Sequence, residues 1–262
     1  MRTHVNGINI DYRDLGRGVP VILIHAFPMN QAMWDDQVRA LAPICRVITL
    51  DLRGFGGSDV PGGPYWMPLM ASDVRGLMTS LGLERAVLAG LSMGGYVAMS
   101  FYRNFPDAVQ ALVLADTRAG ADSPQGRERR FASAEKAQRD GTQSIVDEMV
   151  NLLLSEEAIG TRPDVVARVR AIALQNRAEG LAAAQRGMAA RLDSADVLTT
   201  ARCPALVVAG SHDSLSTPQE MRGWQEKMPN STFTQIEGAG HLSNIEQPES
   251  FNRAIADFIS RL

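Results

Sequence analysis

The stretch that decides the fold is residues 86–105, AVLAGLSMGGYVAMSFYRNF. Its first part, residues 86–91, is a continuous apolar run without alternation, which is typical of a strand buried on both faces of a parallel sheet. Residues 93–105 favour a helix that ends before Pro106, because proline cannot continue a helix. The sequence therefore predicts a buried strand, a sharp turn at Ser92 and a helix that begins directly after the turn.

The same pattern extends to both sides of this stretch. Apolar residues at helical spacing lie between the first strand-like runs, and Asn6-Gly7 predicts a hairpin at the start of the chain. Strands and helices in alternation predict an α/β fold with a mostly parallel central sheet flanked by helices. The other strand-like runs are residues 21–26, 47–52, 111–115, 205–210 and 232–236.

Residues 118–200 have a different composition. They contain sixteen alanines, one aromatic residue (Phe131) and no strand-like run, which favours helix throughout. We expect a core domain formed by residues 1–117 and 201–262, and a helical cap formed by residues 118–200 over the strand ends. Breaks between the cap helices are predicted at Pro124, Gly141, residues 160–163 (GTRP) and Gly180.

Charge and cysteine content exclude several classes of protein. Lys and Arg number 26 against 29 Asp and Glu, a net charge of −3, whereas nucleic-acid binders carry a basic excess. No apolar run is long enough for a signal core or a membrane span, so we expect a soluble, cytoplasmic protein without a membrane partner. Two cysteines, Cys45 and Cys203, cannot form a disulfide framework or a Cys-rich zinc site, and we expect no metal or cofactor.

Ser92 lies in the motif Gly90-x-Ser92-x-Gly94. A serine on a tight strand-to-helix turn exposes its hydroxyl at the carboxyl edge of the sheet, next to a helix N-terminus that stabilises negative charge. The flanking glycines are needed because a Cβ at either position would crowd the turn. The motif alone is weak, and a serine that only caps the helix is the alternative. Its place between a predicted strand and helix favours a catalytic nucleophile.

A serine nucleophile needs a base to accept its proton, and the chain offers four histidines. Our candidate is His241, because it lies in a loop of small residues between the last predicted strand and the last helix. From that loop a side chain can reach over the sheet edge to Ser92. We interpret His4 as a surface residue, His25 as structural and His212 as a neighbour of the candidate acid.

The acid that orients the base should follow a strand. Asp213 comes directly after residues 205–210 and is our candidate for keeping His241 in the correct tautomer. Asp116, directly after residues 111–115, is the alternative, and either aspartate could instead cap a turn.

Acyl transfer also requires hydrogen-bond donors aimed at the oxygen that becomes negative. Met93 follows the nucleophile, so its backbone N–H points into the turn. For the second donor we choose the backbone N–H of Phe27, in the loop after an early strand, where Pro28 has no N–H to offer.

With these residues the whole chain resembles the α/β-hydrolase fold. The order Ser92, Asp213, His241 is the order of that family, residues 25–28 (HAFP) resemble its oxyanion loop, and residues 51–58 (DLRGFGGS) resemble its Asp-x-Arg-Gly-x-Gly-x-Ser turn. Within the family the chain is similar to small esterases that include 3-oxoadipate enol-lactonases and cofactor-free haloperoxidases. One departure is Ala26, where many relatives have glycine.

The resemblance implies a serine hydrolase that cleaves a small carboxylic ester or lactone through an acyl-enzyme, without cofactor or metal. The alternatives are cleavage of a carbon–carbon bond in a β-diketone, or peracid formation, by the same three side chains, and a ligand receptor without catalysis. Specificity for an enol-lactone would need a cation. The insert contains several arginines, among them Arg118, Arg186 and Arg191, but we interpret each of them as a solvated charge on a helix. The sequence leaves the physiological substrate and the oligomeric state open.

Overall fold

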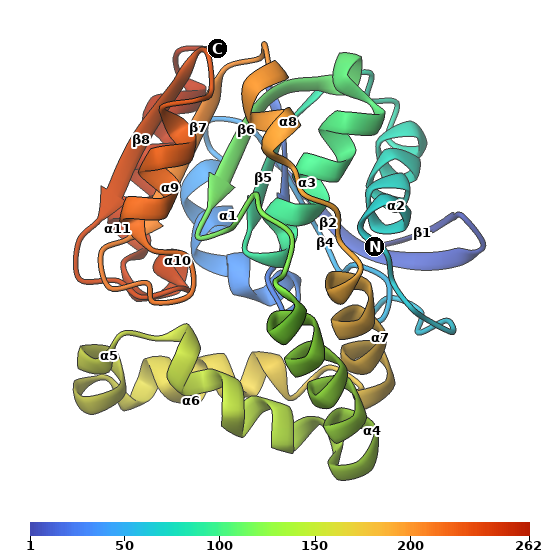
Figure 1. Cartoon of the computed structure of the whole chain (residues 1–262). Coiled ribbons are helices and arrows are strands. Elements are labelled where there is room, and N and C mark those ends of the chain that lie inside the picture. The colour runs from blue at the N-terminus through green and yellow to red at the C-terminus, as the bar shows by residue number, and fades with distance from the viewer.

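The computed structural model describes residues 1–262 and is built around one eight-stranded sheet (Figure 1). The strand order is β1-β2-β4-β3-β5-β6-β7-β8. The pairs β1–β2 and β2–β4 are antiparallel, and all the others are parallel. The predicted α/β architecture is therefore confirmed. The strands are β1 (Arg2–Val5), β2 (Ile8–Leu15), β3 (Pro20–Ile24), β4 (Arg46–Leu50), β5 (Ala86–Leu91), β6 (Val109–Ala115), β7 (Ala205–Gly210) and β8 (Ser231–Ile236).

Helices cover both faces of the sheet, which explains why the central strands are apolar throughout. In β3, Ile22 and Ile24 belong to a cluster with helices α2 and α3, whereas Val21 and Leu23 belong to a cluster with α1 and α11. None of the helices combines the length and apolar content that crossing a lipid bilayer requires. The helices around the sheet are α1 (Asp35–Leu41), α2 (Met67–Ser80), α3 (Met93–Asn104), α8 (Ala195–Thr200), α9 (Pro218–Gln225), α10 (Ser243–Glu246) and α11 (Pro248–Ile259).

Four further helices lie together at the end of the sheet where the strands terminate (Figure 1). They are α4 (Pro124–Leu153), α5 (Glu156–Thr161), α6 (Pro163–Ala173) and α7 (Ala178–Ala189). Helix α4 bends at Gly141, whose φ of 79° and ψ of 177° are not helical. Helix α8 falls within the predicted insert, yet its Val197 and Leu198 pack in the core cluster of α2 and α3. The division into core and cap at residues 118 and 200 stays a prediction.

The predicted helix break at Gly180 is wrong, because this residue lies inside α7. A Cβ at Gly180 would lie 1.9 Å from the carbonyl oxygen of Gly54, in the turn after β4. One face of α7 therefore contacts core backbone directly. The glycine is required here by a close approach between two segments distant in the sequence, and not by the end of a helix.

Candidate active site

The turn between β5 and α3 places Ser92 at the carboxyl edge of the sheet. Its φ of 55° and ψ of −114° are unusual for a residue with a side chain, so surrounding contacts must hold them. The Ser92 N–H donates to the carbonyl oxygen of Ala115 at 2.9 Å, and Thr117 Oγ1 donates to the Ser92 carbonyl oxygen at 2.7 Å. A Cβ at Gly90 would lie 2.2 Å from the carbonyl oxygen of Gly94. The turn therefore requires the glycine before the serine.

Two loops that are distant in the sequence bring His241 and Asp213 to this serine. The His241 Nε2 atom lies 2.8 Å from Ser92 Oγ, and His241 Nδ1 lies 2.8 Å from Asp213 Oδ2. An ionised carboxylate only accepts hydrogen bonds, so Nδ1 carries the proton and Nε2 accepts from the serine hydroxyl. The structure thus joins in one hydrogen-bonded chain the three side chains that the sequence singles out.

Asp213 is held in its ionised form. Its Oδ1 accepts from the backbone N–H of Leu215 at 2.8 Å and of Ser216 at 3.1 Å, and its Oδ2 accepts from Ser216 Oγ at 2.6 Å. Burial acts to raise the pKa of Asp213, but the charge of His241 and these hydrogen bonds outweigh it and lower the pKa below its ordinary value. The carboxylate is therefore charged near neutral pH.

His241 is buried, and its charge state responds to three neighbours. Burial acts to lower its pKa, but the charge and hydrogen bond of Asp213, with a smaller contribution from Asp116, raise the pKa above its ordinary value. Arg118 acts in the opposite direction. The surroundings of His241 therefore favour the protonated form of the imidazole.

The alternative acid, Asp116, is fully buried but bonds to other groups. Its Oδ1 accepts from the Gly210 N–H at 2.7 Å, and its Oδ2 accepts from the Ser243 hydroxyl. Burial raises the pKa of Asp116 to about 8, and repulsion from the charge of Asp213 is the second largest cause of this increase. Asp116 therefore ties the end of β7 to α10, and Asp213 is the aspartate that contacts the histidine.

The two candidate oxyanion donors both have a free N–H. The N–H groups of Phe27 and Met93 donate to no protein group, and Met93 is the first residue of α3, where helices leave their N–H groups unpaired. A Cβ at Gly94 would lie 2.1 Å from the carbonyl oxygen of Ile24. The first turn of α3 therefore touches the end of β3, from which the loop that carries Phe27 emerges.

The histidine at the end of β3 is structural, as its position suggests. His25 Nδ1 donates to the carbonyl oxygen of Ala26 at 2.9 Å, and its Nε2 accepts from the Leu52 N–H at 3.0 Å. Burial lowers the pKa of His25 to about 4, so the ring is neutral. Ala26 does not have a positive φ, so alanine fits here without strain.

Two residues that sequence reasoning missed hold these loops in place. Glu246, which is 1% exposed, accepts from the Gly240 N–H at 2.8 Å and from Ser155 Oγ at 2.6 Å, so it fixes the histidine loop against the start of α5. Asn176, between α6 and α7, donates to the Pro28 carbonyl oxygen at 2.7 Å and thereby fixes the loop after β3 that carries Phe27. No local motif marks either residue, and only their contacts reveal these roles.

The loop with the Asp-x-Arg-Gly pattern, residues 51–58, supports the same region. Asp51 accepts from the backbone N–H of Gln31 at 2.7 Å and of Gly57 at 2.8 Å. Arg53 forms a buried ion pair with Asp73 of α2, at 2.5 Å. These bonds brace the loops beside the sheet edge. No group of three or more His, Cys, Asp or Glu side chains is arranged to hold a metal ion.

The three arginines interpreted from the sequence as solvated helix charges differ in their surroundings. Arg186 of α7 donates to Gln138 of α4 at 2.7 Å, in an exposed position. Arg191 is buried and forms an ion pair with Asp122 at 2.6 Å. Arg118 is the one whose charge acts on His241, and it pairs only at 3.4 Å, with Glu220.

The family described as alpha/beta hydrolase fold matches residues 19–248. The chain belongs to this family. It is 43% identical to a thermophilic esterase from Thermogutta terrifontis, with a TM-score of 0.96 over 99% of this chain and 96% of that one. An enol-lactonase from Burkholderia xenovorans is 30% identical, with a TM-score of 0.92 over 99% of this chain and 100% of that one. The 3-oxoadipate enol-lactonase 2 of Acinetobacter baylyi is 28% identical over 97% of this chain and 94% of its own length. The predicted resemblance to the α/β-hydrolase fold is confirmed.

Proposed function

We propose that this α/β-hydrolase is a serine hydrolase that cleaves a small carboxylic ester or lactone. The observation that carries the proposal is the hydrogen-bonded chain from Ser92 Oγ through His241 to Asp213, with both contacts at 2.8 Å. A hydroxyl becomes a competent nucleophile when a positioned base accepts its proton and a carboxylate stabilises the resulting imidazolium. Similarity to an esterase at 43% identity and to an enol-lactonase at 30% identity supports the same substrate class.

The reaction begins when Ser92 Oγ attacks the carbonyl carbon and His241 Nε2 accepts its proton. The carbonyl oxygen becomes negative and accepts hydrogen bonds from the N–H groups of Phe27 and Met93. When the tetrahedral intermediate collapses, the alkoxide leaves with the proton from His241, and the acyl group remains on Ser92. In a lactone the leaving alkoxide stays attached to the acyl chain.

A water molecule then completes the cycle. His241 accepts a proton from the water as its oxygen attacks the acyl carbon, and the same N–H groups stabilise the second tetrahedral intermediate. Ser92 leaves with the proton from His241, and the carboxylic acid is released. Asp213 stays ionised throughout, because its role is to orient and stabilise the imidazolium.

We also propose that helices α4–α7 form the roof over this site. The Leu242 N–H, next to His241, donates to the Leu153 carbonyl oxygen of α4 at 3.0 Å, so the roof contacts the catalytic loop directly. A roof in this position limits the access of water and selects substrates by shape.

The test is Ser92→Ala, measured with p-nitrophenyl acetate and with a fluorophosphonate probe. We expect hydrolysis and labelling to be lost, since no other nucleophile lies at this position. Ser72→Ala, at a half-buried serine of α2 whose hydroxyl donates to the Pro68 carbonyl oxygen, is the matched control and should retain full activity. Turnover that is unchanged in Ser92→Ala would refute the proposed mechanism.

A further inference from the structure

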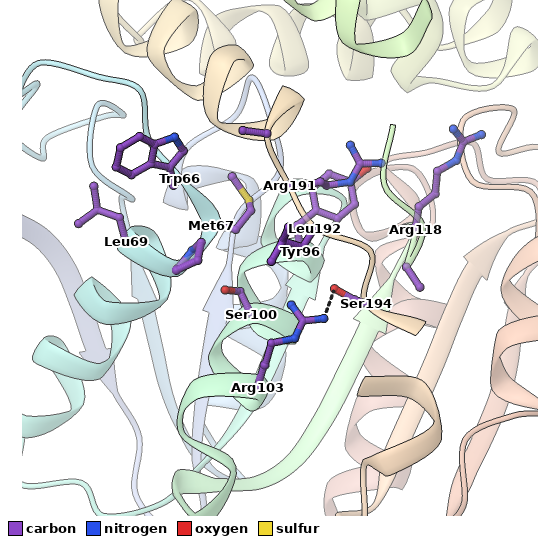
Figure 2. Close-up of a pocket in the computed structure, with 13 residues that line it drawn as sticks. Trp66, Met67, Leu69, Tyr96, Ser100, Arg103, Arg118, Arg191, Leu192 and Ser194 are labelled. Atoms are coloured by element: carbon purple, nitrogen blue, oxygen red, sulfur yellow. Dashed lines mark hydrogen bonds between the residues drawn. The ribbon is translucent and has the colours of Figure 1, made fainter. Parts of the chain in front are cut away.

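A cavity of about 300 Å³ lies beside α2 and α3 (Figure 2). Its walls come from the start of α2, one face of α3 and two connecting segments, residues 118–119 and 190–194, that join the sheet core to α4 and α7. Ser92, Asp213 and His241 do not line it. Its volume is at the lower end of the range for small-molecule sites, which is about 300–1,000 Å³.

One wall of the cavity is apolar. Trp66, which is 53% exposed, lies with Met67 and Leu69 at the start of α2, and Leu192, which is 68% exposed, lies nearer to Arg191 and Tyr96 (Figure 2). Large apolar side chains that stay exposed next to a cavity mark a surface that a ligand can cover. This wall suits an alkyl chain or an aromatic ring.

The opposite wall consists of hydrogen-bond donors. Ser100 of α3 is 4% exposed, and its hydroxyl has no hydrogen-bond partner in the protein (Figure 2). The Arg191 side chain is also 4% exposed, and its Nε–H has no partner, although the guanidinium lies 4.3 Å from the Tyr96 ring. Arg103 reaches the same wall and donates to Ser194 Oγ at 3.4 Å. The Ser100 hydroxyl and the Arg191 Nε–H are thus both left without an acceptor, and the Arg191 Nε–H is the one that is fully buried.

The charge of the lining selects the kind of acceptor. Three of the lining residues are arginines, Arg103, Arg118 and Arg191, and none is Asp or Glu. The carboxylates that pair with these arginines, those of Asp196, Glu220 and Asp122, do not line the cavity. A ligand oxygen inside the cavity therefore meets arginine side chains whose own carboxylate partners lie outside the lining, and it shares these arginines with those partners. A carboxylate fits this wall better than a neutral group.

We propose that this cavity is a second ligand site that binds an amphipathic monocarboxylate. The chain of the ligand lies between Trp66 and Leu192, and its carboxylate accepts from Ser100 and the neighbouring arginines. If each non-hydrogen atom of a ligand takes about 30 Å³, the volume of one water molecule in the liquid, the cavity holds roughly ten such atoms. Octanoate, with its carbon and oxygen atoms, is a ligand of this size.

The position of the site links it to the roof helices. The two connecting segments are hydrogen-bonded to each other, from the Ser194 N–H to the Ala119 carbonyl oxygen at 2.9 Å and from Arg191 to the Gly120 carbonyl oxygen at 2.8 Å. A bound carboxylate contacts both segments and α3 at the same time. It therefore binds across the junction between the core and helices α4–α7.

The experiment is isothermal titration calorimetry of the full chain with sodium octanoate and with 1-octanol. We expect octanoate to bind and octanol to bind more weakly, because its hydroxyl brings no charge to the arginine wall. Leu192→Glu places a carboxylate at the mouth, and we expect it to weaken octanoate binding by at least about tenfold. Ser100→Ala removes the unpaired hydroxyl and should weaken octanoate binding as well. The matched control is Leu152→Glu, at an exposed leucine of α4 outside the cavity, which should leave the affinity unchanged.

Three results would overturn the proposal. They are the absence of octanoate binding, equal affinity for octanoate and octanol, and an octanoate affinity that Leu192→Glu leaves unchanged. The last result would place the bound molecule elsewhere, for example in the catalytic site. The calorimetric readout requires no turnover, so its outcome is independent of whether Ser92 is a nucleophile.

Discussion

Replacement of Asp213 by asparagine tests the proposed catalytic chain most directly. The change preserves the shape of the side chain but removes its charge and replaces one acceptor oxygen by an amide donor. Because Asp213 Oδ2 lies 2.8 Å from His241 Nδ1, an amide N–H at this position makes Nδ1 an acceptor. The proton then moves to Nε2, which can no longer accept from Ser92 Oγ.

The loss should be large because the imidazolium also loses its buried counter-charge. Loss of the correct tautomer in a Ser-His-Asp site costs about 10⁴-fold in kcat. At about 1.36 kcal/mol for each factor of ten, this corresponds to roughly 5 kcal/mol of transition-state stabilisation. The assay is steady-state hydrolysis of p-nitrophenyl acetate at pH 8, with thermal unfolding to verify that the variant is folded.

Asp116→Asn is the matched control for this prediction. Asp116 is as deeply buried as Asp213, but it bonds to Gly210 and Ser243 and not to the histidine. We expect Asp116→Asn to lower kcat by about tenfold at most, since the asparagine still offers an acceptor oxygen. A larger loss in Asp116→Asn than in Asp213→Asn would refute the assignment of the acid.

Two further predictions follow from the electrostatics and packing of the site. Arg118 disfavours the protonated form of His241, so Arg118→Gln should raise the pKa of His241 and move the acidic limb of the pH profile of kcat/KM to higher pH. The control is Arg139→Gln, at an exposed arginine of α4, which should leave the profile in place. A shift of the Arg118→Gln profile to lower pH would contradict the reasoning. Gly94→Ala places a Cβ 2.1 Å from the carbonyl oxygen of Ile24, at the end of β3, so it should lower the free energy of unfolding in urea by about 1–3 kcal/mol and abolish activity. The control is Gly223→Ala, where a Cβ has no atom within 4 Å, and it should not destabilise the protein. Equal stability of the two variants would argue against a tight turn at Gly94.

Much of the fold follows from local patterns in the sequence. The strands of the central sheet are runs of apolar residues because helices cover both faces, and residues 86–105 define the strand, turn and helix around Ser92 without reference to the rest of the chain. The order of serine, aspartate and histidine is likewise a property of the sequence. The local pattern is misleading at Gly180, where glycine suggests a helix end. The glycine is needed there because α7 approaches the backbone of Gly54 too closely for a Cβ.

Other features depend on distances between segments that the sequence does not place. Asp213 and Asp116 both follow parallel strands, and only the tertiary structure shows that one meets His241 and the other meets Ser243. Glu246 carries no motif, yet it binds the histidine loop to the start of α5. The physical reason is that strand and helix formation depends on residues close in the sequence. A hydrogen bond between side chains of two distant loops instead requires the loops to be placed precisely enough for donor and acceptor to lie about 3 Å apart. Packing of the whole chain sets that precision.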